Sequence, residues 1–234
     1  MCGRYVLATS IAGLAEAFDA LYSPEVAQSY APSWNVSPTR TVLGVAADDT
    51  GARALRPYRW GLVPSWARDL SVGGRMFNAR AETVASKPSF RAAFAARRLL
   101  VPADAFYEWS KAPEDARQPY LFRRADGGPL AFAGLFERWH PGPPGGVAAP
   151  EVTTCTIVTV AAGADVADVH DRQPVVLDRD SWDTWLDRTL RDRDELEGLL
   201  RPSAPGTLVR QPVGRAVGRV GVDGAELAEP TTHP

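Results

Sequence analysis

Cys2, the second residue of the chain, carries the side chain with the clearest capacity for covalent chemistry. Removal of the initiator methionine, which is normal before a small residue, would make Cys2 the N-terminus. It would then offer an α-amine, whose ordinary pKa is about 8, and a thiol, whose ordinary pKa is about 8.5. The amine can condense with an aldehyde to a Schiff base, and the thiol can add to the same carbon to close a thiazolidine ring. The alternative is a packed N-terminal cysteine without a chemical role.

Two further ionisable side chains, Glu108 and His170, lie in settings that suit proton transfer. Glu108 stands among the aromatic residues of segment 106–109, where burial would raise its pKa toward neutrality. His170 lies in the polar segment 168–174, between two apolar strand-like runs, and such junctions often deliver catalytic groups. The structural alternatives are a strand carboxylate that faces solvent and a turn histidine satisfied by Asp171.

Asn78, Arg80 and Glu82 stand at alternate positions of one segment. An extended backbone there would place an amide, a guanidinium and a carboxylate on one face. This face could serve a site, and the alternative is an ordinary solvated edge.

Aromatic and basic residues accompany these segments in a combination that suits single-stranded nucleic acid. Bases stack on aromatic rings, and guanidinium groups bind the flanking phosphates. Tryptophan is also a common core residue, which is the alternative for each of them. The residues concerned are Trp34, Trp60, Trp66, Tyr107 and Trp109, together with Arg4, Arg75 and Arg80.

The bulk composition is that of an ordinary soluble globular protein. The 234 residues are 45% hydrophobic and 23% charged, with a formal net charge of −2, so the chain does not coat nucleic acid through bulk charge. A local basic groove is compatible with this balance. No apolar run approaches the roughly 20 residues that span a bilayer, and the N-terminus lacks a secretory signal. We therefore expect a cytoplasmic protein without a membrane segment.

The chain has two cysteines and three histidines. Cys155 lies in a β-branched run over 152–160 and is expected to be a small apolar residue of a buried strand. His140 precedes a loop rich in proline and glycine, and His233 lies in the C-terminal tail. These scattered residues lack metal-ligand spacing, so no metal or other cofactor is expected.

Periodicity predicts more strands than helices. Helices are expected over 11–21, 90–97 and 181–200, the last with a capping box of Asp192 and Glu195. The absence of regular crossover helices favours an α+β fold with mostly antiparallel sheets. Segment 141–146, rich in proline and glycine, is expected to be a surface loop within one domain. Strands are expected over 41–46, 99–102, 120–123, 130–135, 152–160 and 175–177.

Seven short motifs, in order from residue 1 to about residue 227, make the chain resemble the SRAP family of SOS-response-associated peptidases or abasic-site-processing proteins. Each motif is weak alone, but seven in sequence are highly specific. They are Met1-Cys2-Gly3-Arg4, Asn35-Val36-Ser37-Pro38, Trp60-Gly61-Leu62-Val63-Pro64-Ser65-Trp66, Asn78-Ala79-Arg80-Ala81-Glu82-Thr83, Phe106-Tyr107-Glu108-Trp109, His170-Asp171-Arg172-Gln173-Pro174 and Gly224-Ala225-Glu226-Leu227.

This resemblance implies a single β-rich α+β domain over 1–230, with a barrel-like core, peripheral helices and a short tail over 231–234. It implies a covalent thiazolidine cross-link between Cys2 and the opened sugar of an abasic site in single-stranded DNA, formed in the DNA damage (SOS) response. Asn78 would hold the Cys2 end and the opened sugar. Glu108 would shuttle protons, and His170 would assist ring opening and reversal of the cross-link.

The resemblance also assigns the DNA contacts. Arg4 and Arg80 would hold phosphates that flank the lesion, and Arg75, Trp66 and Trp109 would complete the binding surface. Two departures from the family pattern stand out. Gln173 replaces the more usual Met or Arg, and segment 218–221 lacks the Asn that commonly follows its first Gly, which affects the DNA contacts expected there.

Two other functions use the same residues. A cysteine-type peptidase or autopeptidase would employ Cys2 and His170, and it would not need a free N-terminal amine. A non-catalytic single-stranded-DNA-binding module would depend on Arg80 and Trp66 and tolerate the loss of Cys2. In each case a monomer is expected, because no heptad or self-pairing signal is present.

Overall fold

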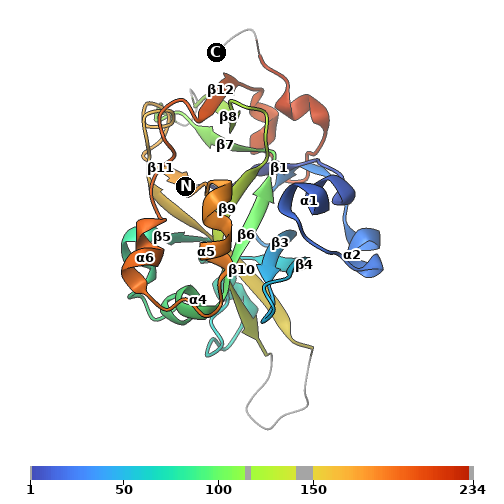
Figure 1. Ribbon diagram of the computed structural model, residues 1–234. Helices are drawn as coiled ribbons and strands as arrows, with labels where there is room; N and C mark the ends of the chain where they lie inside the picture. The colour runs from blue at the N-terminus through green and yellow to red at the C-terminus, as the bar shows by residue number, and fades with distance from the viewer. Residues whose placement is uncertain (1, 114–116, 141–149, 232–234) are drawn as a thin grey trace.

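The computed structural model of the chain describes residues 2–113, 117–140 and 150–231. Two β-sheets form its body, and short helices lie around them (Figure 1). The α+β class expected from the sequence is therefore confirmed. Within the described residues, no helix has both the length and the apolar character needed to cross a membrane.

The larger sheet closes into a barrel. Strand β10 pairs in parallel with β4 and antiparallel with β9, and β3 and β6 complete the circuit. The barrel interior is tightly packed: a Cβ added at Gly44 or Gly134 would come within about 3 Å of neighbouring side chains. Its strands are β3 (Thr41–Ala47), β4 (Arg53–Trp60), β6 (Arg98–Ala103), β9 (Leu130–Trp139) and β10 (Val152–Ala161).

Beyond the barrel, β10 continues and accepts two short strands. Strand β5 (Asn78–Arg80) pairs in parallel with residues 157–159, and β11 (Arg172–Pro174) pairs antiparallel with residues 159–161. One end of β10 therefore lies between the segment that carries Asn78 and the segment that follows His170.

The second sheet is antiparallel throughout and has the order β12-β8-β7-β1-β2. Figure 1 shows β7, β8 and β12 above the barrel strands. Tyr5 of β1 packs edge-on against Trp60 and Phe132 of the barrel and joins the two sheets into one core. The strands are β1 (Tyr5–Leu7), β2 (Ser33–Val36), β7 (Ala105–Trp109), β8 (Pro119–Arg124) and β12 (Leu208–Pro212).

The helices are short and peripheral. Ser10 caps the first by accepting a hydrogen bond from the Gly13 N–H, and Asp19, with φ of 48°, ends it. The α-helices are α1 (Ile11–Phe18), α2 (Pro24–Ser29), α3 (Ala81–Val84), α4 (Arg91–Ala96), α5 (Trp182–Leu186) and α6 (Arg193–Gly198). The 3-10 helices are η1 (Leu70–Arg75), η3 (Arg179–Ser181), η4 (Arg215–Gly218) and η5 (Ala225–Ala228).

The continuous helix predicted over 181–200 is wrong. The structure has two helices, because Asp187 adopts an extended backbone and its carboxylate binds Thr189. The buried guanidinium of Arg98 also holds the carbonyls of the connection between the helices. Asp192 caps α6 through the N–H groups of Asp194 and Glu195, which confirms the Asp192 half of the predicted capping box.

Two strand predictions also need correction. The regular ladder of β11 lies at Arg172–Pro174, ahead of the predicted 175–177, where the chain crosses from β10 to β9. The extended segment over 78–82 ends at Arg80, because helix α3 begins at Ala81. Glu82 therefore leaves the face that Asn78 and Arg80 were expected to share with it. The loop predicted over 141–146 and His233 lie outside the described residues.

Candidate active site at the N-terminal segment

Cys2 lies immediately before β1 and has no exposed surface. Its carbonyl accepts a hydrogen bond of 2.8 Å from Nδ2 of Asn78, the first residue of β5. The Oδ1 atom of Asn78 is also buried, and it has no hydrogen-bond partner among the described residues. A buried acceptor without a donor is uncommon in a folded protein, and here it adjoins the Cys2 backbone.

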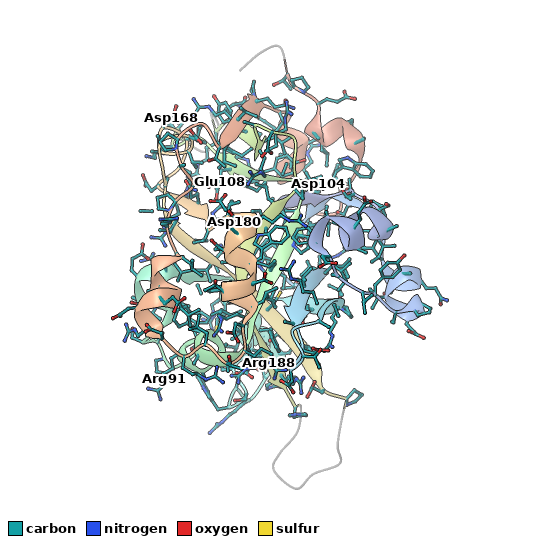
Figure 2. All side chains as sticks on the ribbon, in the orientation of Figure 1. Arg91, Asp104, Glu108, Asp168, Asp180 and Arg188 are labelled. Atoms are coloured by element: carbon teal, nitrogen blue, oxygen red, sulfur yellow. The ribbon has the colours of Figure 1, made fainter. Side chains whose placement is uncertain are left out.

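Glu108 lies on β7, the strand that pairs with β1, and its side chain is only 2% exposed. Figure 2 shows Glu108 near the middle of the molecule, between the antiparallel sheet and the barrel. Burial raises the pKa of this carboxyl from 4.5 to about 7. The predicted burial and upward shift are therefore confirmed, and Glu108 can both give and take a proton at neutral pH.

His170 faces Glu108, with 3.9 Å between its Nε2 and Oε2 of the carboxyl. Its Nδ1 accepts a hydrogen bond of 2.9 Å from the Arg172 N–H. Burial lowers the pKa of the imidazole, whereas that of Glu108 is raised. An ion pair would shift both pKa values in the opposite directions, so burial outweighs ion pairing at both groups, and the Glu108 carboxyl, with its pKa of about 7, is near half protonation at neutral pH.

The Cys2 thiol shares this enclosed environment. Burial raises its pKa well above the usual range, and the negative charge of Glu108 raises it further. The thiolate form is therefore strongly disfavoured at rest. Cys155, the other cysteine, is fully buried on β10, which confirms the structural role expected for it.

The loop that carries His170 is held by charged residues. The Asp171 carboxylate lies 2.6 Å from Nζ of Lys111, so Asp171 pairs with Lys111, unlike in the alternative in which it satisfies His170 in a turn. Arg172 donates 3.0 Å to Glu82 and 2.6 Å to the carbonyl of Thr159 on β10. The sequence offered no signal for Lys111, whose segment becomes a neighbour of His170 only through the fold.

The expected DNA contacts differ in accessibility. Trp66 is 64% exposed, and Arg75 and Arg80 are exposed as well. Trp109 is half-buried and packs against a small second core, and the guanidinium of Arg4 is bound to protein groups. Two of the other aromatic candidates, Trp60 and Tyr107, are fully buried and therefore belong to the core, which was the alternative to base stacking. Trp34 is half-buried.

A groove of about 890 Å³ opens next to Arg4, between strands β1, β2 and β3. Ser37, Thr39 and Arg40 are among the residues that line it, and Thr39 has a φ of 72°. Sequence patterns had singled out the Asn35-to-Pro38 motif but not Arg40. Among the described residues, no group of three or more His, Cys, Asp and Glu side chains is placed to hold a metal ion.

The N-terminal segment of this chain thus lies beside an amide, a carboxyl and an imidazole, and the family of the chain follows from comparison. The family model of SRAP, SOS response associated peptidase, matches residues 1–220, and the chain belongs to this family.

Its relatives carry more specific names. The abasic site processing protein YoaM of Bacillus subtilis is 35% identical over 236 residues, which cover 100% of both chains. YedK of Escherichia coli, of the same description, is 32% identical, with 98% of this chain and 100% of the relative covered. HMCES of Gallus gallus, also so described, is 33% identical over 86% of this chain and 67% of the relative.

Solved structures share the fold. A protein from Bacteroides thetaiotaomicron superposes with a TM-score of 0.87 at 21% identity, covering 98% of this chain and 100% of the other. A protein from Bordetella bronchiseptica gives a TM-score of 0.75 at 26% identity, with 91% and 100% covered. The β-rich α+β architecture is thus common to these chains.

Proposed function

We propose that this protein captures abasic sites in single-stranded DNA by forming a covalent thiazolidine through Cys2, and so protects the damaged strand during the SOS response. The names of its relatives give the substrate class. The single observation that carries the chemistry is the enclosure of the Cys2 segment beside Asn78 and Glu108, with His170 opposite. Those groups are suited to an aldehyde substrate that must be opened, held and kept from side reactions.

The first chemical step opens the sugar. An abasic deoxyribose is mainly a closed hemiacetal, so its C1′ hydroxyl must lose a proton while its ring oxygen gains one. Glu108, whose pKa is about 7, and His170 form an acid and base pair that can move both protons near neutral pH. The open form then presents an aldehyde at C1′.

The covalent step uses both nucleophiles of Cys2 in order. With Met1 removed, the amine attacks C1′, and loss of one water gives an imine. The thiol then adds its sulfur to C1′ and its proton to the nitrogen, which closes the five-membered ring. This closure removes the imine that would promote β-elimination and strand breakage. Oδ1 of Asn78 is free to accept a hydrogen bond from the amine or the opened sugar.

The burial of the thiol favours this order over peptidase chemistry. A cysteine peptidase needs a thiolate stabilised by a nearby positive charge. Here burial and the charge of Glu108 raise the pKa of the Cys2 thiol, and together they outweigh the positive charge of the N-terminus and the Arg4 backbone hydrogen bond, which lower it. A neutral thiol that follows the amine fits these surroundings, whereas a resting thiolate does not.

The DNA would lie over the exposed cationic and aromatic residues near the site. Arg75 and Arg80 are free to bind phosphates, and the exposed ring of Trp66 can stack on a base. Trp109, half-buried at the end of β7, would line the inner part of the binding surface. Recognition would then depend on phosphates and on the missing base, with little reading of sequence.

The test is capture of an abasic oligonucleotide, measured by denaturing gel and intact mass. Protein with Met1 removed should give a heat-stable adduct whose mass is protein plus DNA minus one water. Cys2→Ala should abolish the stable adduct, and a variant with one extra residue before Cys2 should do the same by blocking the amine. Cys155→Ala, the matched control, should leave the adduct intact. A stable adduct of undiminished yield in Cys2→Ala contradicts the proposal.

A further inference from the structure

The guanidinium of Arg4, two residues after Cys2, is bound to groups within the protein. Its Nη1 donates to Oδ1 of Asn35 at 2.8 Å and to the carbonyl of Val217 at 3.1 Å. Its Nη2 lies 3.5 Å from the carbonyl of Gly218. Burial lowers the pKa of Arg4, although the group stays charged. Arg4 thus joins the first strand to a segment more than 200 residues away in sequence.

Asn35 of β2 makes the second half of this connection. Its side chain is 9% exposed, and Nδ2 donates to the carbonyls of Val217 at 3.2 Å and Val222 at 2.7 Å. Asp223 then accepts hydrogen bonds from the Ser33 hydroxyl and the Trp34 N–H. Residues 213–231, which we call the C-terminal segment, are therefore fixed along β2.

The C-terminal segment also covers the face of β7 that lies behind Glu108. Tyr107, fully buried next to Glu108, packs against Val213 and Val217 in the small second core. The Tyr107 N–H donates to the carbonyl of Arg4 at 2.9 Å. The backbone that carries Glu108 and the backbone that follows Cys2 are thus joined at Arg4, directly under the C-terminal segment.

We propose that Arg4 is a positioning residue that fixes the Cys2 segment against β7 by clamping the C-terminal segment, with Asn35 as its partner. This inference rests on the proposed function and replaces the expectation that Arg4 binds a DNA phosphate. The planar guanidinium reaches one amide oxygen and two carbonyls at once, which the single ammonium of a lysine cannot reproduce. The role therefore depends on the shape of arginine more than on its charge.

The experiment compares Arg4→Lys, Arg4→Ala, Asn35→Ala and the double variant of Arg4→Lys with Asn35→Ala against wild type. The control is Arg179→Lys, because Arg179 also donates to a carbonyl, that of Ala17, but its helix η3 contributes no residue to the site. Two quantities are measured: the covalent rate at saturating abasic DNA, and the salt-dependent affinity for undamaged single-stranded DNA.

Arg4→Lys and Asn35→Ala should each slow capture by about tenfold, because small misplacements of reacting groups are costly. The double variant should be no slower than about the worse single variant, since both act through the same segment. Affinity for undamaged DNA and its salt dependence should not change. Hydrogen exchange at residues 217–223 should be faster in both single variants and unchanged in Arg179→Lys.

A wild-type rate in Arg4→Lys, together with a smaller salt dependence in Arg4→Ala, overturns the inference and assigns Arg4 to a phosphate. Unchanged exchange at residues 217–223 in both single variants also overturns it. Failure of wild type to form any adduct defeats the proposed function instead. The exchange measurement still decides in that case whether Arg4 clamps the C-terminal segment.

Discussion

Arg98 and Glu108 are two charged residues that the fold buries almost equally, with 3% and 2% of their surfaces exposed. Arg98 donates to the carbonyls of Phe94, Trp185 and Asp187, and it lies near the ring of Trp185. Its pKa falls to about 10 through burial, which leaves it charged at neutral pH. Glu108 instead has a pKa of about 7 and faces an imidazole.

The difference shows that burial alone does not determine whether an ionisable residue keeps one protonation state or titrates near neutral pH. Arg98 keeps one protonation state because its donors are met by carbonyls at and after helix ends, which would otherwise lack a hydrogen-bond donor. Glu108 changes protonation within the physiological range, which suits proton transfer. The first residue holds the fold together, and the second is the candidate for chemistry.

Replacement of Glu108 should have the largest effect on activity. Glu108→Gln should slow capture by roughly 100-fold or more, since positioned acid and base groups commonly contribute that much. Single-turnover rates on abasic DNA measure this. A rate change of less than about threefold would contradict the role of Glu108 in proton transfer. Glu108 would then be a buried residue that serves only stability, as Arg98 does.

The same variant should be more stable than wild type at alkaline pH. The folded pKa of Glu108, about 7, lies above the ordinary 4.5, so its stabilising contribution is full below pH 4.5 and lost as pH rises through 7. The stability of Glu108→Gln relative to wild type should therefore rise by about 3 kcal/mol between pH 4.5 and pH 8. Urea unfolding at both pH values measures this, and a constant difference would contradict the shift.

Arg98→Leu should destabilise the fold by about 3 kcal/mol or more, because several buried carbonyls lose their donor. The largest local effect is expected between α5 and α6, where Arg98 holds the connection. Chemical unfolding measures the loss, and Arg98→Lys should recover part of it. The folded fraction should capture abasic DNA at the wild-type rate, and a rate loss that exceeds unfolding would link this region to the site.

Asp171 and Lys111 should shift the pH dependence of capture in opposite directions. Burial is the main cause of the lowered pKa of His170, while the charge of Asp171 raises this pKa and that of Lys111 lowers it. Asp171→Asn should therefore move the limb of the pH–rate profile that belongs to His170 to lower pH, and Lys111→Met to higher pH. Because both groups are largely exposed, changes in rate should stay below about tenfold. The double variant should return toward wild type, and shifts of the same sign would exclude this electrostatic account.

The smallest effect is expected on DNA affinity. Arg75→Ala and Arg80→Ala should each lower the slope of log affinity against log salt by about 0.7 for single-stranded DNA. Titration with labelled undamaged oligonucleotide at several salt concentrations measures it. Arg91→Ala is the control, since Arg91 lies on α4 and far from Glu108 in Figure 2. Equal slopes for all three variants would remove Arg75 and Arg80 from the binding surface.

The sequence predicted the fold class and most strands because alternation and β-branched runs report burial directly. Periodicity alone did not predict barrel closure, which depends on β10 pairing with β4 and β9 at the same time; the barrel-like core was expected only from the family resemblance. It also predicted one continuous helix over 181–200. Periodicity does not reveal that Arg98 binds backbone carbonyls between α5 and α6 and so interrupts the helix.

The candidate site was predicted through motifs, and the structure adds what motifs lack. The raised pKa of Glu108 could be anticipated from its aromatic neighbours in sequence. The engagement of Arg4 by Asn35 and Val217 could not, because these partners lie 31 and 213 residues away. The same holds for Lys111 and Asp171, which the fold alone brings together.

The enclosure of Cys2 sets an order of events during synthesis of the chain. Its carbonyl is held by Asn78, 76 residues later, and the segment clamped by Arg4 begins more than 200 residues after Arg4 along the chain. While the ribosome is still extending the chain, the first residues therefore have none of these partners and remain open to processing. Met1, whose removal the proposed chemistry requires, is most accessible to processing at that stage. Maturation of the nucleophile then precedes assembly of the pocket that shields it.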